Sequence, residues 1–179
     1  MKGKTNKRIT GTVLTAVFAA VICVLSPLTL PVFAVPFTLS VFVICCVSTA
    51  IEEKAAASTL LYVLLGAAGL PVFAAFTGGA GVLAGATGGF VIGYIPFALI
   101  TGIASRKLKN GFAVFGVSLL GLALLYLFGS VWYGFTTKAD VAKVLTVSVF
   151  PFIIPDILKV AAGVFCGSRI KRAINRTKE

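Results

Sequence analysis

The chain has 179 residues, of which 59% are hydrophobic and only 12% are charged, and its mean hydropathy is +1.07. A soluble domain carries about a quarter charged residues, because water must wet its exterior. A water-facing surface of that kind is therefore excluded. The formal net charge is +11, but the basic residues cluster at the ends of apolar segments, without the surface stripe of a nucleic-acid-binding protein. We expect a membrane protein with no nucleic-acid partner.

Apolar segments separated by polar residues, proline or glycine predict six transmembrane helices in one domain over residues 1–179. A crossing takes about 20 apolar residues, so little of the chain is left for a soluble domain. The predicted fold class is all-α, a polytopic bundle in the plasma membrane, surrounded by lipid. In chain order, the predicted helices are 9–25, 37–51, 55–69, 88–104, 112–133 and 141–166.

The distribution of Lys and Arg predicts the orientation of this bundle. With the N-terminus in the cytoplasm and six crossings, most of the 16 basic residues fall on the cytoplasmic side. They are Lys2, Lys4, Lys7, Arg8, Lys54, Arg106, Lys107, Lys109, Arg169, Lys171, Arg172, Arg176 and Lys178. Such an excess marks cytoplasmic segments, so both termini are expected there. Lys159 is the one basic residue that topology does not explain.

Asp156 and Lys159 form the first candidate site, in the last predicted helix. A charged side chain at the centre of a bilayer costs about 2.5–3.5 kcal/mol, so an unpaired one is rare. The spacing of three residues puts both groups on one helix face. Pro151 and Pro155 each remove a backbone donor, so the helix is expected to bend or begin near the acid. Together the two charged groups complement the donors and acceptor of a cyclic urea.

A plain ion pair that locks two helices is the alternative for Asp156 and Lys159. Buried ion pairs stabilise a fold poorly compared with apolar packing. We therefore favour a ligand-binding role.

The second candidate is the glycine-rich segment 77–89. As a loop, its backbone amides could bind a carboxylate, particularly where Gly88 and Gly89 open the fourth helix. Alternatively, its spacing is typical of a face where two helices pack closely. Glycine recurs every four residues at Gly81, Gly85, Gly89 and Gly93. The segment lacks the lysine and hydroxyl residue of a phosphate-binding P-loop, which argues against ATP binding.

Small residues also recur every four positions in the first predicted helix, at Thr12, Ala16 and Ala20. This spacing lets another helix approach closely. Packing within the chain accounts for most such stripes, and an external partner is the alternative.

Neither catalysis nor metal binding is expected. The chain has no His, and its 4 Cys residues lie in apolar segments without metal-ligand spacing. With no His and no nucleophile–base pair evident, an intramembrane enzyme is disfavoured. A purely structural membrane protein is disfavoured too, because the buried charges of Asp156 and Lys159 would then have no functional role.

In these features the chain resembles the BioY family, the biotin-specific S components of energy-coupling factor (ECF) transporters. The resemblance rests on residues 69–73 (Gly-Leu-Pro-Val-Phe), on segment 77–89 and on Asp156 followed three residues later by Lys159. Length and topology extend it over nearly the whole chain. Ala86 departs from the proline expected in a Gly-Pro-Thr-Gly-Gly sequence.

The resemblance implies a six-helix S component that binds biotin on the outer side as its transported ligand, without a cofactor. It also implies a transmembrane coupling subunit, docked on small residues of the first helix, and two cytoplasmic ATPases. The ureido ring would lie near Asp156 and Lys159, and the loop after the third helix would close the site. An S component for another vitamin, and a solitary biotin transporter without ATPases, are the alternatives. The predicted binding residues are Asp156, Lys159, Phe73, Phe76, Thr77, Gly78, Gly79, Thr87, Gly88 and Gly89.

Overall fold

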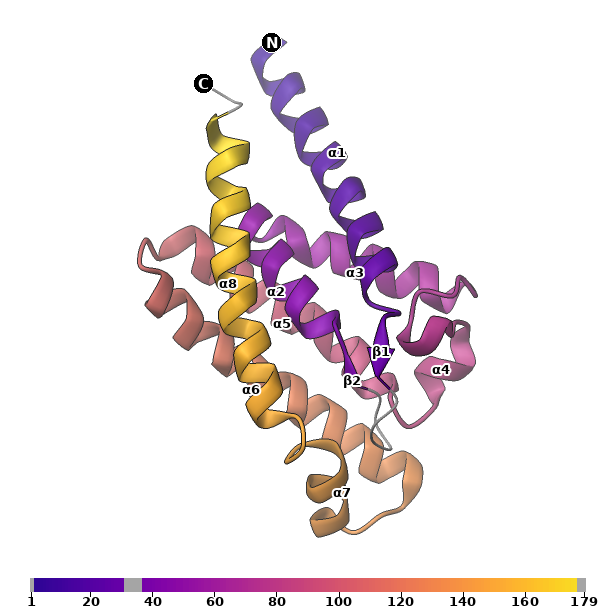
Figure 1. Cartoon of the computed structure of the whole chain (residues 1–179). Coiled ribbons are helices and arrows are strands. Elements are labelled where there is room, and N and C mark those ends of the chain that lie inside the picture. The colour runs from indigo at the N-terminus through magenta and orange to yellow at the C-terminus, as the bar shows by residue number, and fades with distance from the viewer. Residues whose placement is uncertain (1, 31–36, 177–179) are drawn as a thin grey trace.

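The computed structural model describes the backbone of residues 2–30 and 37–176 and the side chains of residues 9–29 and 37–176. Figure 1 shows a bundle of helices with both chain termini at the same end. β1 and β2 pair in antiparallel register, with Thr29 opposite Thr38. The elements are α1 (Lys2–Leu25), β1 (Thr29–Leu30), β2 (Phe37–Thr38), α2 (Ser40–Ile51), α3 (Lys54–Ala67), η1 (Ala74–Phe76), α4 (Ala80–Ala84), α5 (Gly88–Lys107), α6 (Gly111–Thr137), α7 (Val141–Ser148) and α8 (Ile153–Arg176).

The predicted all-α class is confirmed, but the number of crossings is less clear-cut than the sequence suggested. Among the described residues, α5 and α6 are long and apolar enough to cross a membrane on their own. The pair α7 and α8 adds a third crossing if it is taken as one span bent by 47°. Ile9–Leu25, α2 and α3 are apolar but shorter, with 10–17 residues each. A six-helix count therefore depends partly on helices below the usual spanning length.

The predicted helix over 141–166 is two helices, which corrects the sequence-based boundaries and confirms the expected bend. α7 ends at Ser148 and α8 begins at Ile153. A proline ring clashes with the carbonyl of the preceding turn, so Pro151 and Pro155 cannot lie inside one continuous helix without distorting it. Asp156 consequently lies in the first turn of α8, where the helix dipole favours a carboxylate.

The core centres on α2, which is buried along almost its whole length by α8, α5, α1 and α3. Ile44 and Val47 of α2 are among its fully buried side chains. The hydroxyls of Ser48 and Thr49 donate to backbone carbonyls one turn earlier, at 2.7 and 2.9 Å. These polar groups are thus satisfied inside the helix, as an apolar environment requires.

The glycine-rich segment 77–89 is mostly a loop that contains the short helix α4. Gly89 and Gly93, in α5, pack closely against α6, because a Cβ atom at either position would collide with residues of that helix. At Gly81 a Cβ atom would have no neighbour within 4 Å. The loop interpretation therefore holds for most of the segment, and the helix-packing interpretation holds where the segment enters α5.

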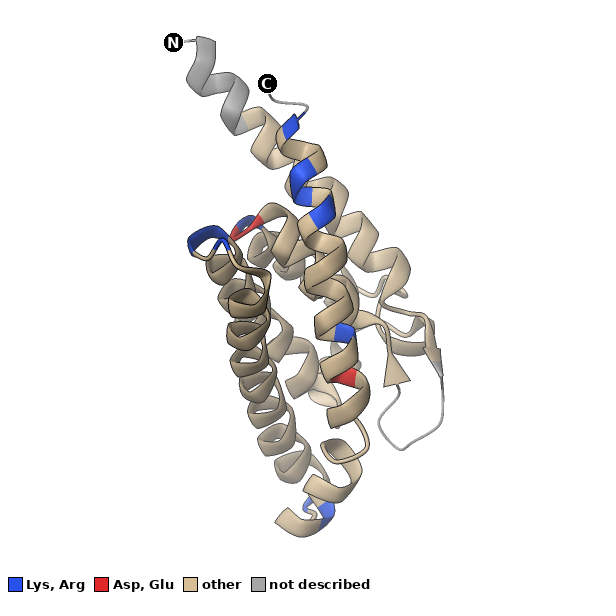
Figure 2. Cartoon of the chain, turned by 60° about the vertical axis from the view of Figure 1, so that its left-hand side comes forward, with Lys and Arg blue, Asp and Glu red and all other residues tan. Residues whose placement is uncertain are grey.

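Most of the basic residues of the described chain gather at the end that holds both termini (Figure 2). There Arg106 of α5 pairs with Glu53 at 2.6 Å, and Lys171 of α8 pairs with Glu52 at 3.0 Å. The turn between α2 and α3 thus meets the ends of α5 and α8. This asymmetry agrees with the positive-inside pattern, while the cytoplasmic location of this end stays a prediction. The described side chains do not include Lys2, Lys4, Lys7, Arg8 and Lys178.

Candidate functional site

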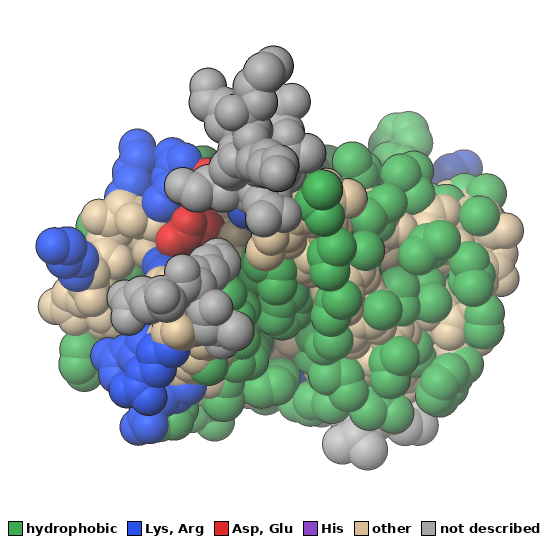
Figure 3. Space-filling model, turned by 90° about the horizontal axis from the view of Figure 1, so that it is seen from above, with side chains coloured by type: hydrophobic (Ala, Val, Ile, Leu, Met, Phe, Trp, Pro, Cys, Tyr) green, Lys and Arg blue, Asp and Glu red, His purple; other side chains and the backbone are tan. Residues whose placement is uncertain are grey.

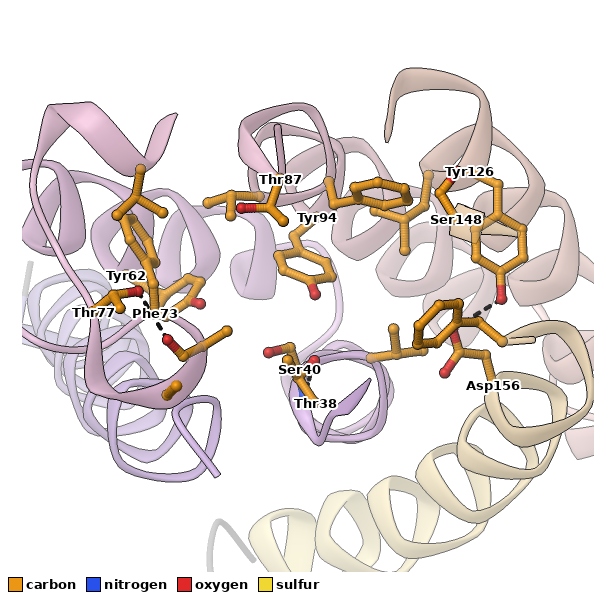
Figure 4. Close-up of a pocket in the computed structure, with 18 of the residues that line it drawn as sticks. Thr38, Ser40, Tyr62, Phe73, Thr77, Thr87, Tyr94, Tyr126, Ser148 and Asp156 are labelled. Carbon is orange, nitrogen blue, oxygen red and sulfur yellow. Dashed lines mark hydrogen bonds between the residues drawn. The ribbon is translucent and has the colours of Figure 1, made fainter. Parts of the chain in front are cut away.

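A cavity of about 400 Å³ lies inside the bundle (Figure 4). Sites for small organic ligands typically have about 300–1,000 Å³, so this volume fits one small molecule. Most of its wall is apolar or aromatic, with a few polar groups. The lining residues are Thr38, Ser40, Val41, Tyr62, Phe73, Ala74, Ala75, Thr77, Val82, Gly85, Thr87, Phe90, Val91, Tyr94, Leu125, Tyr126, Ser148, Phe152, Asp156 and Lys159.

Asp156 forms one end of this cavity. Its side chain is only 6% exposed. The ammonium group of Lys159 donates to Oδ1 at 2.9 Å, and the hydroxyl of Tyr126 donates to Oδ2 at 2.9 Å. Each carboxylate oxygen has two lone pairs, so both can accept a further hydrogen bond. The carboxylate is therefore held in place by the protein and is still able to accept from the N–H groups of a ligand.

Lys159 is more fully engaged than Asp156. Besides the carboxylate, its ammonium group donates to the backbone carbonyl of Thr38 at 2.7 Å. It also lies 3.5 Å from the centroid of the Phe37 ring, a favourable cation–π position. Lys159 thus lines the cavity and also ties α8 to β2. The ion pair between Asp156 and Lys159 is therefore formed, and a ligand-binding role of the same two residues stays a prediction.

The opposite side of the cavity is formed by Tyr62, Phe73 and Thr77, and Thr87 lies between the two sides (Figure 4). The rings of Phe73 and Tyr62 meet edge to face, with 5.5 Å between their centroids. The hydroxyl of Thr77 donates to the carbonyl of Ala74 at 2.8 Å. Within the described part of the chain, the hydroxyl of Thr87 forms no hydrogen bond. Phe73, Thr77 and Thr87 thus line one cavity with Asp156 and Lys159, and their role in binding a ligand stays a prediction.

Five predicted binding residues lie elsewhere, although all are in the described part of the chain. The wall of the cavity does not include Phe76, Gly78, Gly79, Gly88 or Gly89. Phe76 is 62% exposed, and the amides of Gly79 and Gly88 donate to carbonyls of neighbouring loop and helix residues. The loop satisfies its own backbone groups, so fewer of its amides are available to a ligand than the sequence suggested. A binding role for these five residues stays a prediction without geometric support.

The small residues Thr12, Ala16 and Ala20 all have exposed side chains on α1. The opposite face of α1 packs against the bundle, with Ala19 and Ile22 buried. Packing within the chain therefore does not cover this stripe, and a role in docking a partner stays a prediction.

A model of the BioY family matches residues 1–176. The chain belongs to the BioY family. It is 31% identical to the biotin transporter BioY2 of Lactococcus lactis subsp. cremoris over 97% of both chains. It is 37% identical to the biotin transporter BioY of Thermotoga maritima, over 87% of this chain and 92% of that one.

The fold of this BioY protein also matches a solved structure, the crystal structure of an S-component for biotin from an ECF-type ABC transporter. The TM-score is 0.83 over 93% of both chains, at 22% identity. At that identity the match shows a shared fold. With this fold and its apolar helices, this BioY protein is an integral membrane protein.

Sequence reasoning missed several residues that line the cavity of this BioY protein. Tyr94 of α5 lies over Ser40 and Thr38 in the middle of the cavity, and Tyr126 of α6 contacts the acid (Figure 4). The sequence did contain a signal for these cavity residues, because both tyrosines interrupt apolar segments of predicted membrane helices. A buried Tyr hydroxyl needs a partner, so these positions pointed to a polar interior. In the described chain, no cluster of three or more His, Cys, Asp or Glu could hold a metal ion.

Proposed function

We propose that this chain is the biotin-binding and translocating subunit of an ECF-type vitamin importer, with its single S-component domain over residues 1–179. Relatives that match nearly its whole length are named biotin transporters, and the matching solved structure is an S-component for biotin. The observation that carries the proposal is the buried carboxylate of Asp156, which the protein fixes at the end of a mainly apolar cavity. Ionisable residues inside a membrane protein are costly and usually functional, so this position favours a polar ligand.

Biotin has the chemistry that this cavity complements. Its cyclic urea presents two N–H donors, and a carboxylate acceptor forms stronger hydrogen bonds to such donors than a neutral group does. Asp156 would accept from the urea, while Tyr126 and Lys159 keep both of its oxygens in position. The aromatic side chains of Tyr94 and Phe152 would cover the apolar bicyclic ring and the valeryl chain.

The carboxylate of biotin would lie away from Asp156, because like charges repel. Thr87 is the better of the two predicted hydroxyl donors. Its hydroxyl has no hydrogen bond in the described chain, whereas the hydroxyl of Thr77 already donates to a backbone carbonyl. Thr87 therefore donates to the ligand without first breaking an internal bond.

Transport would require partners and no covalent chemistry by this chain. The exposed stripe of Thr12, Ala16 and Ala20 on α1 supports docking on a transmembrane coupling subunit, because small residues let two helices approach closely. A pair of cytoplasmic ATPases would then drive the release of biotin. Biotin uptake measured with and without these subunits separates an ECF importer from a solitary transporter.

Binding of the purified protein to biotin, thiamine and riboflavin tests the proposed ligand directly. Isothermal titration calorimetry should show tight binding of biotin alone, and native mass spectrometry should find biotin retained through purification. Tight binding of thiamine or riboflavin without biotin binding would contradict the choice of vitamin. Absence of binding to any of the three would contradict the proposed function.

A further inference from the structure

A second cavity, of about 560 Å³, opens at the basic end of the molecule between the start of α6 and the last turns of α8. Its rim carries three cations, Lys109, Arg169 and Arg172. Its lining also includes the apolar rings of Phe115 and Phe165. Figure 3, which looks onto this end, shows the basic side chains gathered on one side of it. The biotin proposal gives this cavity no role.

The cations of the rim lack acidic partners, unlike other basic residues at the same end. Arg106 and Lys171 pair with Glu53 and Glu52, the two acidic side chains described there. Within the described part of the chain, no ion pair involves the three rim cations. Their positive charge is therefore available to an anionic ligand.

The guanidinium group of Arg169 is positioned to bind such a ligand. The centre of its guanidinium group lies 5.2 Å from the centroid of the Phe165 ring, one turn earlier on α8. Stacking on an aromatic ring fixes the plane of a guanidinium group and leaves its N–H donors free at the edge. The fork of these donors matches phosphate oxygens in a bidentate arrangement. The geometry thus favours a phosphate group over a monatomic anion.

The surroundings of the cavity are suited to lipid chains. Phe112 is 86% exposed and Phe165 is 62% exposed. Only 28% of the apolar span of α6 is buried, so most of this helix faces the bilayer. A soluble phosphate compound would leave this apolar surface uncovered, whereas the acyl chains of a phospholipid would cover it. Basic residues at the ends of membrane helices also attract anionic headgroups.

We propose that this cavity binds the headgroup phosphate of an anionic phospholipid, whose acyl chains lie along the surface of α6 and α8. Arg169 and Arg172 hold the phosphate, and Lys109 adds charge from the loop before α6. The bound lipid bridges α6 and α8, the two helices that also carry Tyr126 and Asp156. The site differs from the biotin cavity in ligand, in residues and in its position along the bundle.

Native mass spectrometry of the full-length protein with added phosphatidylglycerol or phosphatidylcholine tests this site. Arg169→Gln and Arg172→Gln should each lower the retained phosphatidylglycerol about fivefold, as expected for the loss of one basic contact near a membrane surface, and leave phosphatidylcholine unchanged. Arg169→Lys should give an intermediate loss, because it keeps the charge without the fork. Biotin binding, measured on the same samples, should be unchanged and shows that each variant is folded.

Lys107→Gln is the matched control, since it removes one charge at the same end from a residue that does not line the cavity. It should retain phosphatidylglycerol like the unmodified protein. An equal loss in Lys107→Gln would assign the effect to general surface charge and overturn the proposal. Inorganic phosphate that displaces phosphatidylglycerol at equal concentration would overturn the choice of a lipid. Unchanged lipid retention in both Arg variants, with weaker association of a coupling subunit, would assign the cavity to a protein partner instead.

Discussion

At one side of the main cavity, Asp156 is held by Tyr126 and Lys159, side chains from α6 and α8. At the other side, Thr77 belongs to a loop whose backbone groups mostly satisfy one another. A buried charge is stable only when fixed partners surround it, whereas a loop next to water can rely on its own short hydrogen bonds. Under the biotin proposal, the first side would select the ligand and the second would let it enter.

Asp156→Asn tests the fixed side and has the largest expected effect. Loss of the charged acceptor should weaken biotin binding about a hundredfold or more, because removal of one partner from a buried, hydrogen-bonded charge pair typically costs 2–5 kcal/mol of binding free energy. It should also lower the unfolding temperature, since Lys159 keeps its charge with less compensation. Calorimetry and thermal unfolding measure the two effects separately.

The double variant Asp156→Asn, Lys159→Met is the control for that experiment. It removes both charges at similar volume, so the unfolding temperature should return toward that of the unmodified protein while biotin binding stays lost. If the double variant bound biotin normally, the pair would be a structural lock and would not belong to the ligand site.

Gly78→Ala tests the loop side. A Cβ atom at Gly78 would collide with the backbone carbonyl of Leu70, so the loop must shift, at a cost of about 1–3 kcal/mol. We expect a lower unfolding temperature and weaker biotin binding. Gly81→Ala is the control, because a Cβ atom there meets nothing within 4 Å. Equal effects of the two substitutions would mean that close packing is not what fixes this loop.

Tyr126→Phe distinguishes the effect of positioning the Asp156 carboxylate from the effect of its charge. It keeps the ring and removes one hydrogen bond to Asp156, and a hydrogen bond to a charged group contributes about 1.5–3 kcal/mol. Biotin affinity should fall about tenfold to a hundredfold, with the fold retained. Tyr133→Phe, outside the cavity, should leave the affinity unchanged. An unaltered affinity in Tyr126→Phe would show that Lys159 alone positions the acid.

Thr87→Val has the smallest expected effect. It removes one donor to the biotin carboxylate at nearly constant volume, so biotin affinity should fall about tenfold, at the low end of the 1.5–3 kcal/mol for a hydrogen bond to a charged group. Thr77→Val should matter less, because the hydroxyl of Thr77 is engaged with Ala74. Titration with biotin methyl ester checks the assignment: Thr87→Val should weaken binding of the ester less than binding of biotin, because a neutral ester oxygen accepts a weaker hydrogen bond than a carboxylate. A loss with the ester as large as with biotin would place the carboxylate elsewhere.

The sequence by itself determined the membrane class, most helix positions and the pairing of Asp156 with Lys159. These depend on local quantities, namely apolar length, charge placement and the three-residue spacing that puts two side chains on one helix face. Pro151 and Pro155 also predicted the bend between α7 and α8, but they did not predict where each helix ends.

Only the tertiary structure decided what surrounds the acid. Tyr126 reaches Asp156 across 30 residues of chain, and Lys159 meets the carbonyl of Thr38 across 121. The structure also decided that Gly79 and Gly88 use their amides within the protein. No periodicity encodes such contacts, because they depend on how whole helices pack against one another, and that packing is set by all their side chains together.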